Sequence, residues 1–174
     1  MRAATFDEQP GHEIFSDAER SAWHALFERH FGVADGRKAL DLASGTGVIS
    51  HLMHDLGFAV TGMDWSEAML EKARAKSRLR GSNIRFLLGD AEHTLEEDDS
   101  YDVIVTRHLV WTLVDPAAAF AEWFRVLKPG GKLLVVDGDF VSPTWATKLN
   151  KAMSGFLESI GFRKPTEPVA HMQT

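Results

Sequence analysis

Five short apolar runs, separated by segments with helical spacing, are the feature that most limits the folds open to this chain. These runs are Ala39–Leu42, Ala59–Met63, Ile84–Leu88, Val103–Thr106 and Leu133–Val136. They are almost continuously apolar, which is typical of parallel strands that are covered on both faces of a sheet. Because helical segments alternate with these strands, the sequence predicts an α/β domain with a doubly wound, mostly parallel sheet and helices on both faces.

The segments between the runs carry the apolar stripes and end signals of helices. Residues Val48–Leu56 have one apolar face that stops at Gly57, and Ser66 is a suitable N-cap for the next helix. Ahead of the first run, Ser16 and Glu19 have the spacing of a capping box. That spacing predicts a further helix before the sheet begins.

Two more helices are predicted towards the C-terminus. Asp115-Pro116 marks the start of the first, and its end is expected at Pro129-Gly130-Gly131. Its inward stripe is expected to contain Phe124 and to leave Trp123 outside. Ser142-Pro143 predicts the start of the last helix by the same combination of cap and proline.

Composition limits the domain count, the partners and the compartment. The 174 residues predict a single domain over residues 1–174, divided into an N-terminal helical segment (1–35), a core (38–137) and a C-terminal helix with a tail (142–174). The 19 basic and 25 acidic groups give a net charge of −6, which disfavours nucleic acid and membrane as partners. Cysteine is absent, so we expect no thiol chemistry and a reducing, cytoplasmic location. The acidic run 96–99 is expected to be a solvated loop.

The residues that follow each strand are the candidates for a site, because open parallel sheets bind ligands beyond the carboxyl ends of their strands. Small residues follow the first run directly ahead of a helix: Ala43, Ser44, Gly45 and Gly47. Asp64 comes about twenty residues later, where a carboxylate can accept hydrogen bonds from a ribose diol. A glycine turn of this kind also occurs merely to let a helix pack closely on a sheet, and the turn alone does not separate the two interpretations.

Five segments form an ordered set of motifs along the chain: Ala39–Gly47, Val60–Ser66, Leu88–Glu92, Tyr101–Val105 and Leu127–Leu133. Together they resemble the class I S-adenosylmethionine-dependent methyltransferases that act on small molecules. The resemblance covers residues 38–137. It implies a Rossmann-like fold, S-adenosylmethionine as cofactor, S-adenosylhomocysteine as product, and an enzyme that methylates a small-molecule acceptor.

The resemblance also implies roles for residues after the first two strands. Asp41 is expected to hold the methionyl amino group, and the backbone of residues 43–47 is expected to line the methionine part. Asp64 is expected to bind both ribose hydroxyls, with Trp65 against the adenine face.

Residues after the third and fourth strands complete the implied cofactor site. Asp90 is expected to accept from the adenine amine, and the Ala91 N–H to donate to a ring nitrogen, with Glu92 beside them. Thr106 and Arg107 are expected to pass beneath the methionine arm, mainly through backbone contact.

The chain departs from the family pattern in two places. The family usually has glycine at the position of Ala43, which narrows the turn by one methyl group. Only fourteen residues follow Ile160, too few for the two strands that usually end the family sheet. Either the sheet lacks those strands, or the given sequence lacks the segment that forms them.

Histidines are the candidates for a general base or a metal ligand. His108, two residues past the fourth run, is the candidate catalytic base if the acceptor must lose a proton, although it could equally shape the loop or pack against Trp111. His51 and His54 are spaced to share a metal ion, but no carboxylate partner is specified. A solvated helix face is the simpler explanation for this pair, and no metal site is predicted.

The N-terminal segment Phe6–Phe31 is expected to act as a lid, by analogy with the family. Trp23, Phe27 and Trp111 are candidates for an apolar wall around the acceptor, whose aromatic faces would also suit a sulfonium charge. The alternative is that Trp23 and Phe27 belong to the core.

Two other functions remain open at this point. A non-catalytic module that binds S-adenosylmethionine would have the same fold, and cofactor turnover would distinguish it from an enzyme. A nicotinamide-dependent oxidoreductase is the weaker alternative, because the third glycine position of its fingerprint is Ser50 here. The sequence allows a monomer or a homodimer and does not identify the acceptor.

Overall fold

The computed structural model describes residues 16–137, which lie within one compact unit. The helix predicted after Ser142, the first part of the predicted lid and the question of further strands near the C-terminus all fall outside the described residues.

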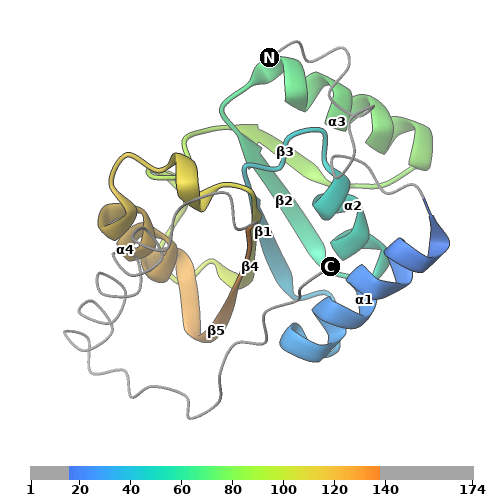
Figure 1. The fold of residues 1–174 in the computed structure, drawn as a ribbon, viewed down its shortest axis with the longest axis horizontal. Coiled ribbons are helices and arrows are strands. Elements are labelled where there is room, and N and C mark those ends of the chain that lie inside the picture. Colours follow the sequence, from blue (N-terminus) through green and yellow to red (C-terminus); the bar gives the residue numbers. More distant parts are fainter. Residues whose placement is uncertain (1–15, 138–174) are drawn as a thin grey trace. The chain divides into compact units, whose positions relative to one another are not determined.

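The described part of the chain forms a five-stranded, all-parallel sheet with the order β3-β2-β1-β4-β5 (Figure 1). The strands are β1 (Lys38–Leu42), β2 (Ala59–Asp64), β3 (Arg85–Leu88), β4 (Tyr101–Arg107) and β5 (Leu127–Val136). The predicted α/β fold class is therefore confirmed. Each predicted run forms a strand, and β5 begins six residues earlier than its apolar run.

The apolar runs of the three central strands, β1, β2 and β4, are buried because helices cover both faces of the sheet. Ala39 and Leu40, which point to opposite faces of β1, are both fully buried, as are Val103 and Ile104 on β4. Edge positions are more open, and Val135 on β5 remains 37% exposed.

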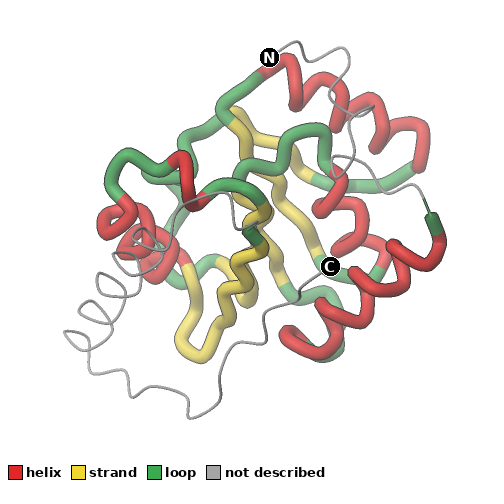
Figure 2. The backbone as a smooth tube through the Cα atoms, viewed as in Figure 1, coloured by secondary structure: helices red, strands yellow, loops and turns green. Residues whose placement is uncertain are grey.

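The α-helices of the described residues are divided between the two faces of the sheet (Figures 1 and 2). One face is covered by α1 (Asp17–Phe31), α2 (Val48–Asp55) and α3 (Glu67–Arg80), and α4 (Pro116–Val126) covers the opposite face. A short 3₁₀ turn, Val110–Thr112, connects β4 to α4.

The predicted helix starts are confirmed at the atomic level for two helices. The Ser16 hydroxyl accepts a hydrogen bond from the Glu19 N–H at 3.1 Å and caps α1. Asp115 caps α4 by accepting from the N–H groups of Ala117 and Ala118, both at 3.1 Å. Ser66 holds the N-cap position of α3 without a side-chain capping bond.

The orientation predicted for α4 was wrong by one residue. Trp123 is fully buried, whereas Phe124 is 46% exposed. The inward stripe contains Ala119, Phe120, Trp123 and Val126, in i, i+3 and i+4 steps. The helix also ends at Val126 rather than at Pro129-Gly130-Gly131, which instead forms an irregular turn inside β5.

The main hydrophobic core lies between the sheet and helices α1 to α3. Phe27 is completely buried there, stacks on Phe31 at 6.1 Å between ring centroids, and belongs to the same cluster as Leu52 and Phe58. Phe27 is therefore a core residue, as the alternative interpretation held, and cannot line an acceptor site. Trp23 packs against this core with its ring 5.5 Å from that of Phe27.

Candidate functional site

The strand order reverses between β1 and β4, and the residues after these two strands therefore flank the point where open α/β sheets bind ligands. The parallel pairing brings the carboxyl ends of all five strands to the same edge of the sheet. The predicted cofactor residues follow β1, β2, β3 and β4, and so they gather at this edge.

The turn after β1 has an unusual backbone conformation. Ala43, Gly45 and Gly47 have positive φ angles of 58°, 55° and 82°. The turn is held by hydrogen bonds from Ser44 N–H to the Met63 carbonyl at 2.9 Å and from Gly47 N–H to the Ser44 carbonyl at 2.8 Å. Ala43 is the strained member, because a β-carbon in the left-handed region costs about 1–2 kcal/mol.

Two glycines allow helix α2 to approach the sheet closely. A β-carbon on Gly47 would lie 2.9 Å from the Phe86 ring, and one on Gly62 would lie 2.7 Å from the same ring. The β-carbon on Gly62 would also lie 2.9 Å from the Ser50 hydroxyl. In a dinucleotide fingerprint, the third glycine lies on the helix and allows the helix to pack closely on the strand. In this chain the helix residue at that position is Ser50, and the glycine that makes room for its side chain is Gly62 on β2.

Asp41 is a buried carboxyl group at the end of β1. Its Oδ2 accepts a 2.5 Å hydrogen bond from the Ser50 hydroxyl, and only 2% of the residue is exposed. Burial raises the pKa of Asp41 from 3.8 to about 7, against the opposing effects of the Ser50 hydrogen bond and the charge of Arg107. A cationic group placed beside Asp41 would favour its ionised form.

Asp64 organises the loops around the glycine turn. Its two carboxylate oxygens accept from the Gly45 N–H at 2.8 Å and from the Ser66 N–H at 2.9 Å. Each carboxylate oxygen has a second lone pair, so Asp64 can still accept from a ligand hydroxyl. Trp65, directly after it, is 88% exposed at the same edge.

Two acidic residues after β3 have different roles: Asp90 is exposed at the ligand edge, whereas Glu92 makes structural hydrogen bonds. The exposed Asp90 carboxylate accepts a hydrogen bond from the Glu92 N–H at 2.8 Å. The Glu92 carboxylate accepts from the N–H groups of Val114 and Asp115 at 2.8 and 3.0 Å. Glu92 therefore joins the β3–β4 connection to the start of α4.

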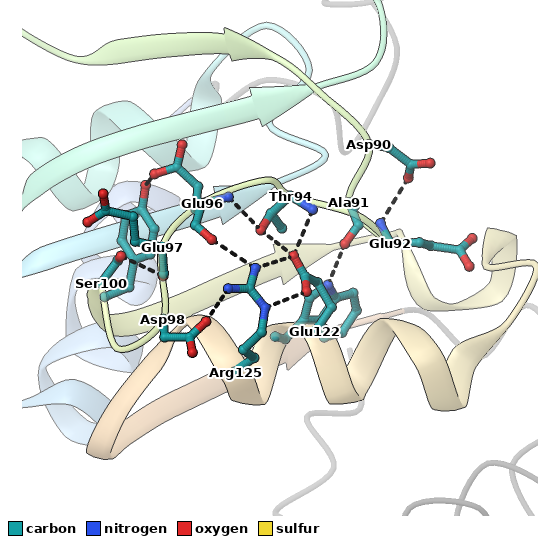
Figure 3. Close-up of polar contacts among 12 residues, drawn as sticks. Asp90, Ala91, Glu92, Thr94, Glu96, Glu97, Asp98, Ser100, Glu122 and Arg125 are labelled. Atoms are coloured by element: carbon teal, nitrogen blue, oxygen red, sulfur yellow. Dashed lines mark hydrogen bonds and ion pairs between the residues drawn. The ribbon is translucent and has the colours of Figure 1, made fainter.

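Helix α4 fixes the same connection from below (Figure 3). The Trp123 indole N–H donates to the Ala91 carbonyl at 2.7 Å, and Glu122 accepts from the N–H and hydroxyl of Thr94 at 2.9 and 2.6 Å. Arg125 binds Glu122 through two nitrogens, and this ion pair lowers the pKa of Glu122 from 4.5 to about 2. Sequence reasoning missed this support, because the orientation of Trp123 was wrongly predicted.

The acidic run 96–99 is more ordered than a solvated loop. Arg125 also donates to Asp98 Oδ1 at 2.5 Å and to the Glu96 carbonyl at 2.8 Å (Figure 3). The Glu96 carboxylate receives the Tyr101 hydroxyl at 2.6 Å and Arg85 at 2.9 Å. The run is thus tied to α4 and to two strands, and its exposed members are residues 97–99.

The residues at the carboxyl end of β4 lie against β1, β5 and α1. The buried Thr106 hydroxyl donates to the Leu42 carbonyl at 3.1 Å, which locks the ends of β1 and β4 together. The Arg107 guanidinium lies 5.7 Å from the centre of the Trp23 ring. His108 has a positive φ of 59°, and its Nδ1 lies 3.6 Å from Asp137 Oδ1.

The two histidines of α2 do not form the solvated face that was predicted. His51 is 5% exposed and its ring lies 6.4 Å from that of Phe86; burial lowers its pKa from 6.5 to about 4. His54 instead pairs with the Asn83 side chain at 2.8 Å. The apolar stripe of α2 is wide enough to include His51, because α1 and α3 pack on both sides of the helix.

Residues 16–137 contain no group of three histidine or acidic side chains placed to hold a metal ion. None of the helices described is both long and apolar enough to cross a membrane.

Comparison with known proteins gives a consistent family assignment. Residues 40–135 match the model of a methyltransferase domain family. A demethylmenaquinone methyltransferase from Renibacterium salmoninarum is 31% identical over 98% of this chain and 73% of its own length. A ubiquinone/menaquinone biosynthesis C-methyltransferase from a Shewanella species is 35% identical over 72% of this chain, which spans only 54% of that relative.

A solved structure agrees with the sequence relatives. A protein from Methanococcus maripaludis, described as a candidate S-adenosylmethionine-dependent methyltransferase, superposes with a TM-score of 0.68 at 25% identity. The match covers 82% of this chain and 75% of that one.

Proposed function

This chain belongs to the class I S-adenosylmethionine-dependent methyltransferases, and we propose that it transfers a methyl group to a small-molecule acceptor. The observation that carries the proposal is the pair of acidic side chains, Asp41 and Asp64, on neighbouring strands around a glycine turn at the switch point of the sheet. The two carboxyl groups are close enough for the charge of Asp64 to contribute to the raised pKa of Asp41.

The residues present fit S-adenosylmethionine. The buried Asp41 carboxyl suits the cationic amino group of the methionine part, and Asp64 retains lone pairs for the ribose hydroxyls. The exposed Trp65 ring and the exposed Asp90 carboxylate suit the face and the amine of adenine. We propose the backbone of residues 43–47, Ala91, Thr106 and Arg107 as the remaining contacts.

The reaction is an in-line displacement. When bound, S-adenosylmethionine would supply an electrophilic methyl group, and the methyl–sulfur bond would break with its electron pair leaving on sulfur as the acceptor atom bonds to the methyl carbon. The fold contributes mainly by holding the acceptor in line with that bond and by excluding water. Where the acceptor carries a proton, His108 at the end of β4 is the residue proposed to remove it.

The acceptor is proposed to be a small apolar molecule. Trp111 and Val114, in the connection between β4 and α4 that also contains His108, are 51% and 92% exposed and provide apolar surface. We propose quinones such as demethylmenaquinone, which appear in the names of the two relatives, as the first acceptors to test. The net charge of −6 and the absence of cysteine support an acceptor other than nucleic acid and a cytoplasmic location, for a monomer or a homodimer.

Turnover tests this function. The purified chain is incubated with S-adenosylmethionine and a panel of reduced quinones and phenols, and S-adenosylhomocysteine is quantified against a reaction without acceptor. Acceptor-dependent product formation supports the proposal. Cofactor binding without turnover on a broad panel would favour the non-catalytic binding module instead.

A further inference from the structure

The parallel pairing of β4 and β5 places His108 and Asp137 next to each other. Arg107 and Val136 are partners in the register, so the next residue after each strand emerges at the same level of the ligand edge. The His108 N–H donates to the Val136 carbonyl at 3.0 Å, which extends the pairing by one step. The position of His108 is thus fixed by the sheet even though its side chain lies in a loop.

The side chain of Asp137 contacts two residues of the loop after β4, His108 and Val110. Its Oδ2 accepts from the Val110 N–H at 3.1 Å, and its Oδ1 lies 3.6 Å from His108 Nδ1. The Asp137 side chain is only 15% exposed. Because its other oxygen is engaged by the backbone, the carboxylate has little freedom to turn away from the imidazole.

The two ring nitrogens of His108 have different surroundings. Nδ1 is buried and faces the carboxylate, while 36% of the side chain is exposed. The separation of 3.6 Å is longer than a hydrogen bond, and such catalytic contacts often tighten only when ligands bind. In a neutral imidazole, the nitrogen that faces an acceptor carries the proton and leaves the other nitrogen basic.

We propose that Asp137 is a positioning residue that keeps the proton of neutral His108 on Nδ1 and so leaves Nε2 as the atom that takes the acceptor's proton. This inference rests on the proposed methyl-transfer function. The backbone supports the arrangement, because His108 has a positive φ of 59° and hydrogen bonds from the His108 N–H to the Val136 carbonyl and from the Val110 N–H to Asp137 maintain this conformation.

The tautomer can be measured directly by ¹⁵N NMR of the full chain at a pH where the ring is neutral. The His108 resonances are assigned with His108→Asn, because asparagine tolerates a positive φ better than most residues. Wild type is expected to show predominantly the Nδ1–H form. Asp137→Asn can keep the Val110 bond with its oxygen and present an N–H group to Nδ1, so a reversal to the Nε2–H form is expected.

Asp137→Glu and the cofactor titration complete the test. The glutamate restores a carboxylate, and a return towards the Nδ1–H form is expected. A predominant Nε2–H form in wild type would overturn the proposal even if neither Asp137 variant folds, and an unchanged tautomer in folded Asp137→Asn would also overturn it. Titration of wild type with S-adenosylmethionine reports separately on the proposed function, because a failure to bind would leave the tautomer result intact.

Discussion

The Ser50 hydroxyl donates a 2.5 Å hydrogen bond to the Asp41 carboxylate, and this bond joins the first turns of α2 to the end of β1. Ser50 occupies the position where the dinucleotide fingerprint has its third glycine, and its side chain makes a hydrogen bond to Asp41 that a glycine could not make. The same contact opposes the effect of burial on the pKa of Asp41. The ionisation of Asp41 therefore leads to two predictions.

S-adenosylmethionine is predicted to bind more tightly as pH rises from 6 to 7. The pKa of Asp41 is about 7, and only the ionised carboxylate attracts the ligand's ammonium group. The ionised fraction rises about fivefold over this interval, and we expect a similar gain in affinity. Calorimetry at the two pH values measures the effect, with Asp41→Asn as the control that should bind weakly and without this dependence. Equal wild-type affinities at both pH values would contradict the prediction.

Asp41→Asn is predicted to be more stable than wild type above pH 7. Because the folded pKa of Asp41 lies above its unfolded value of 3.8, the folded state binds more protons between these values. The contribution of Asp41 to the free energy of unfolding of wild type therefore falls as pH rises from 3.8 to about 7, and the fall is complete above pH 7. Urea unfolding at pH 5 and pH 8 should show a variant advantage that grows by about 1–3 kcal/mol. A difference between the proteins that is independent of pH would show that Asp41 is not the titrating group.

Ala43→Gly is predicted to stabilise the fold. The substitution removes a β-carbon from a residue with a φ of 58°, and the gain should reach about 1 kcal/mol. Ala121→Gly, inside α4, is the matched control and should lose about 0.5–1 kcal/mol. Thermal unfolding compares both variants with wild type. Equal losses in the two variants would mean that the turn is not strained at Ala43.

Glu122→Gln is predicted to destabilise the chain at neutral pH by about 1–3 kcal/mol, because the ionised carboxylate binds Arg125 and Thr94. The folded pKa of Glu122 is lowered from 4.5 to about 2, so its contribution is complete above pH 4.5 and is lost as pH falls towards 2. The difference from wild type should shrink over that range in denaturant titrations. Glu97→Gln, at an exposed position of the nearby loop, should stay within about 0.5 kcal/mol of wild type.

Much of the fold could be predicted from the chain because the parallel strands are apolar on both faces. Val103 and Ile104 are adjacent residues buried on opposite faces of β4, and such runs are visible in any sequence. Helix starts were equally clear where a cap bonds locally, as at Ser16 and Asp115. The orientation of α4 was not, since Trp123 and Phe124 are both apolar and only the packing against the sheet decides which is buried.

The candidate site shows the same limit. Asp41 and Asp64 could be identified because they directly follow apolar runs. Asp137 also directly follows one, but its relation to His108 depends on the β4–β5 register, which includes an irregularity between Tyr101 and Val103. The assignment of His51 to a solvated face was wrong, because its burial depends on how the neighbouring helices pack and the residue spacing along α2 does not reveal that packing.

Calorimetric titration with S-adenosylmethionine, S-adenosylhomocysteine and NAD tests the central claim most directly. Wild type is predicted to bind both adenosyl-sulfur ligands and not NAD. Asp64→Asn should lose at least about tenfold in affinity for them, because the amide nitrogen that replaces one carboxylate oxygen cannot accept a hydrogen bond from a ribose hydroxyl. Spectroscopic evidence that the variant is folded is needed, since Asp64 also binds the Gly45 and Ser66 N–H groups. Absence of binding by folded wild type, or undiminished binding by folded Asp64→Asn, would contradict the account.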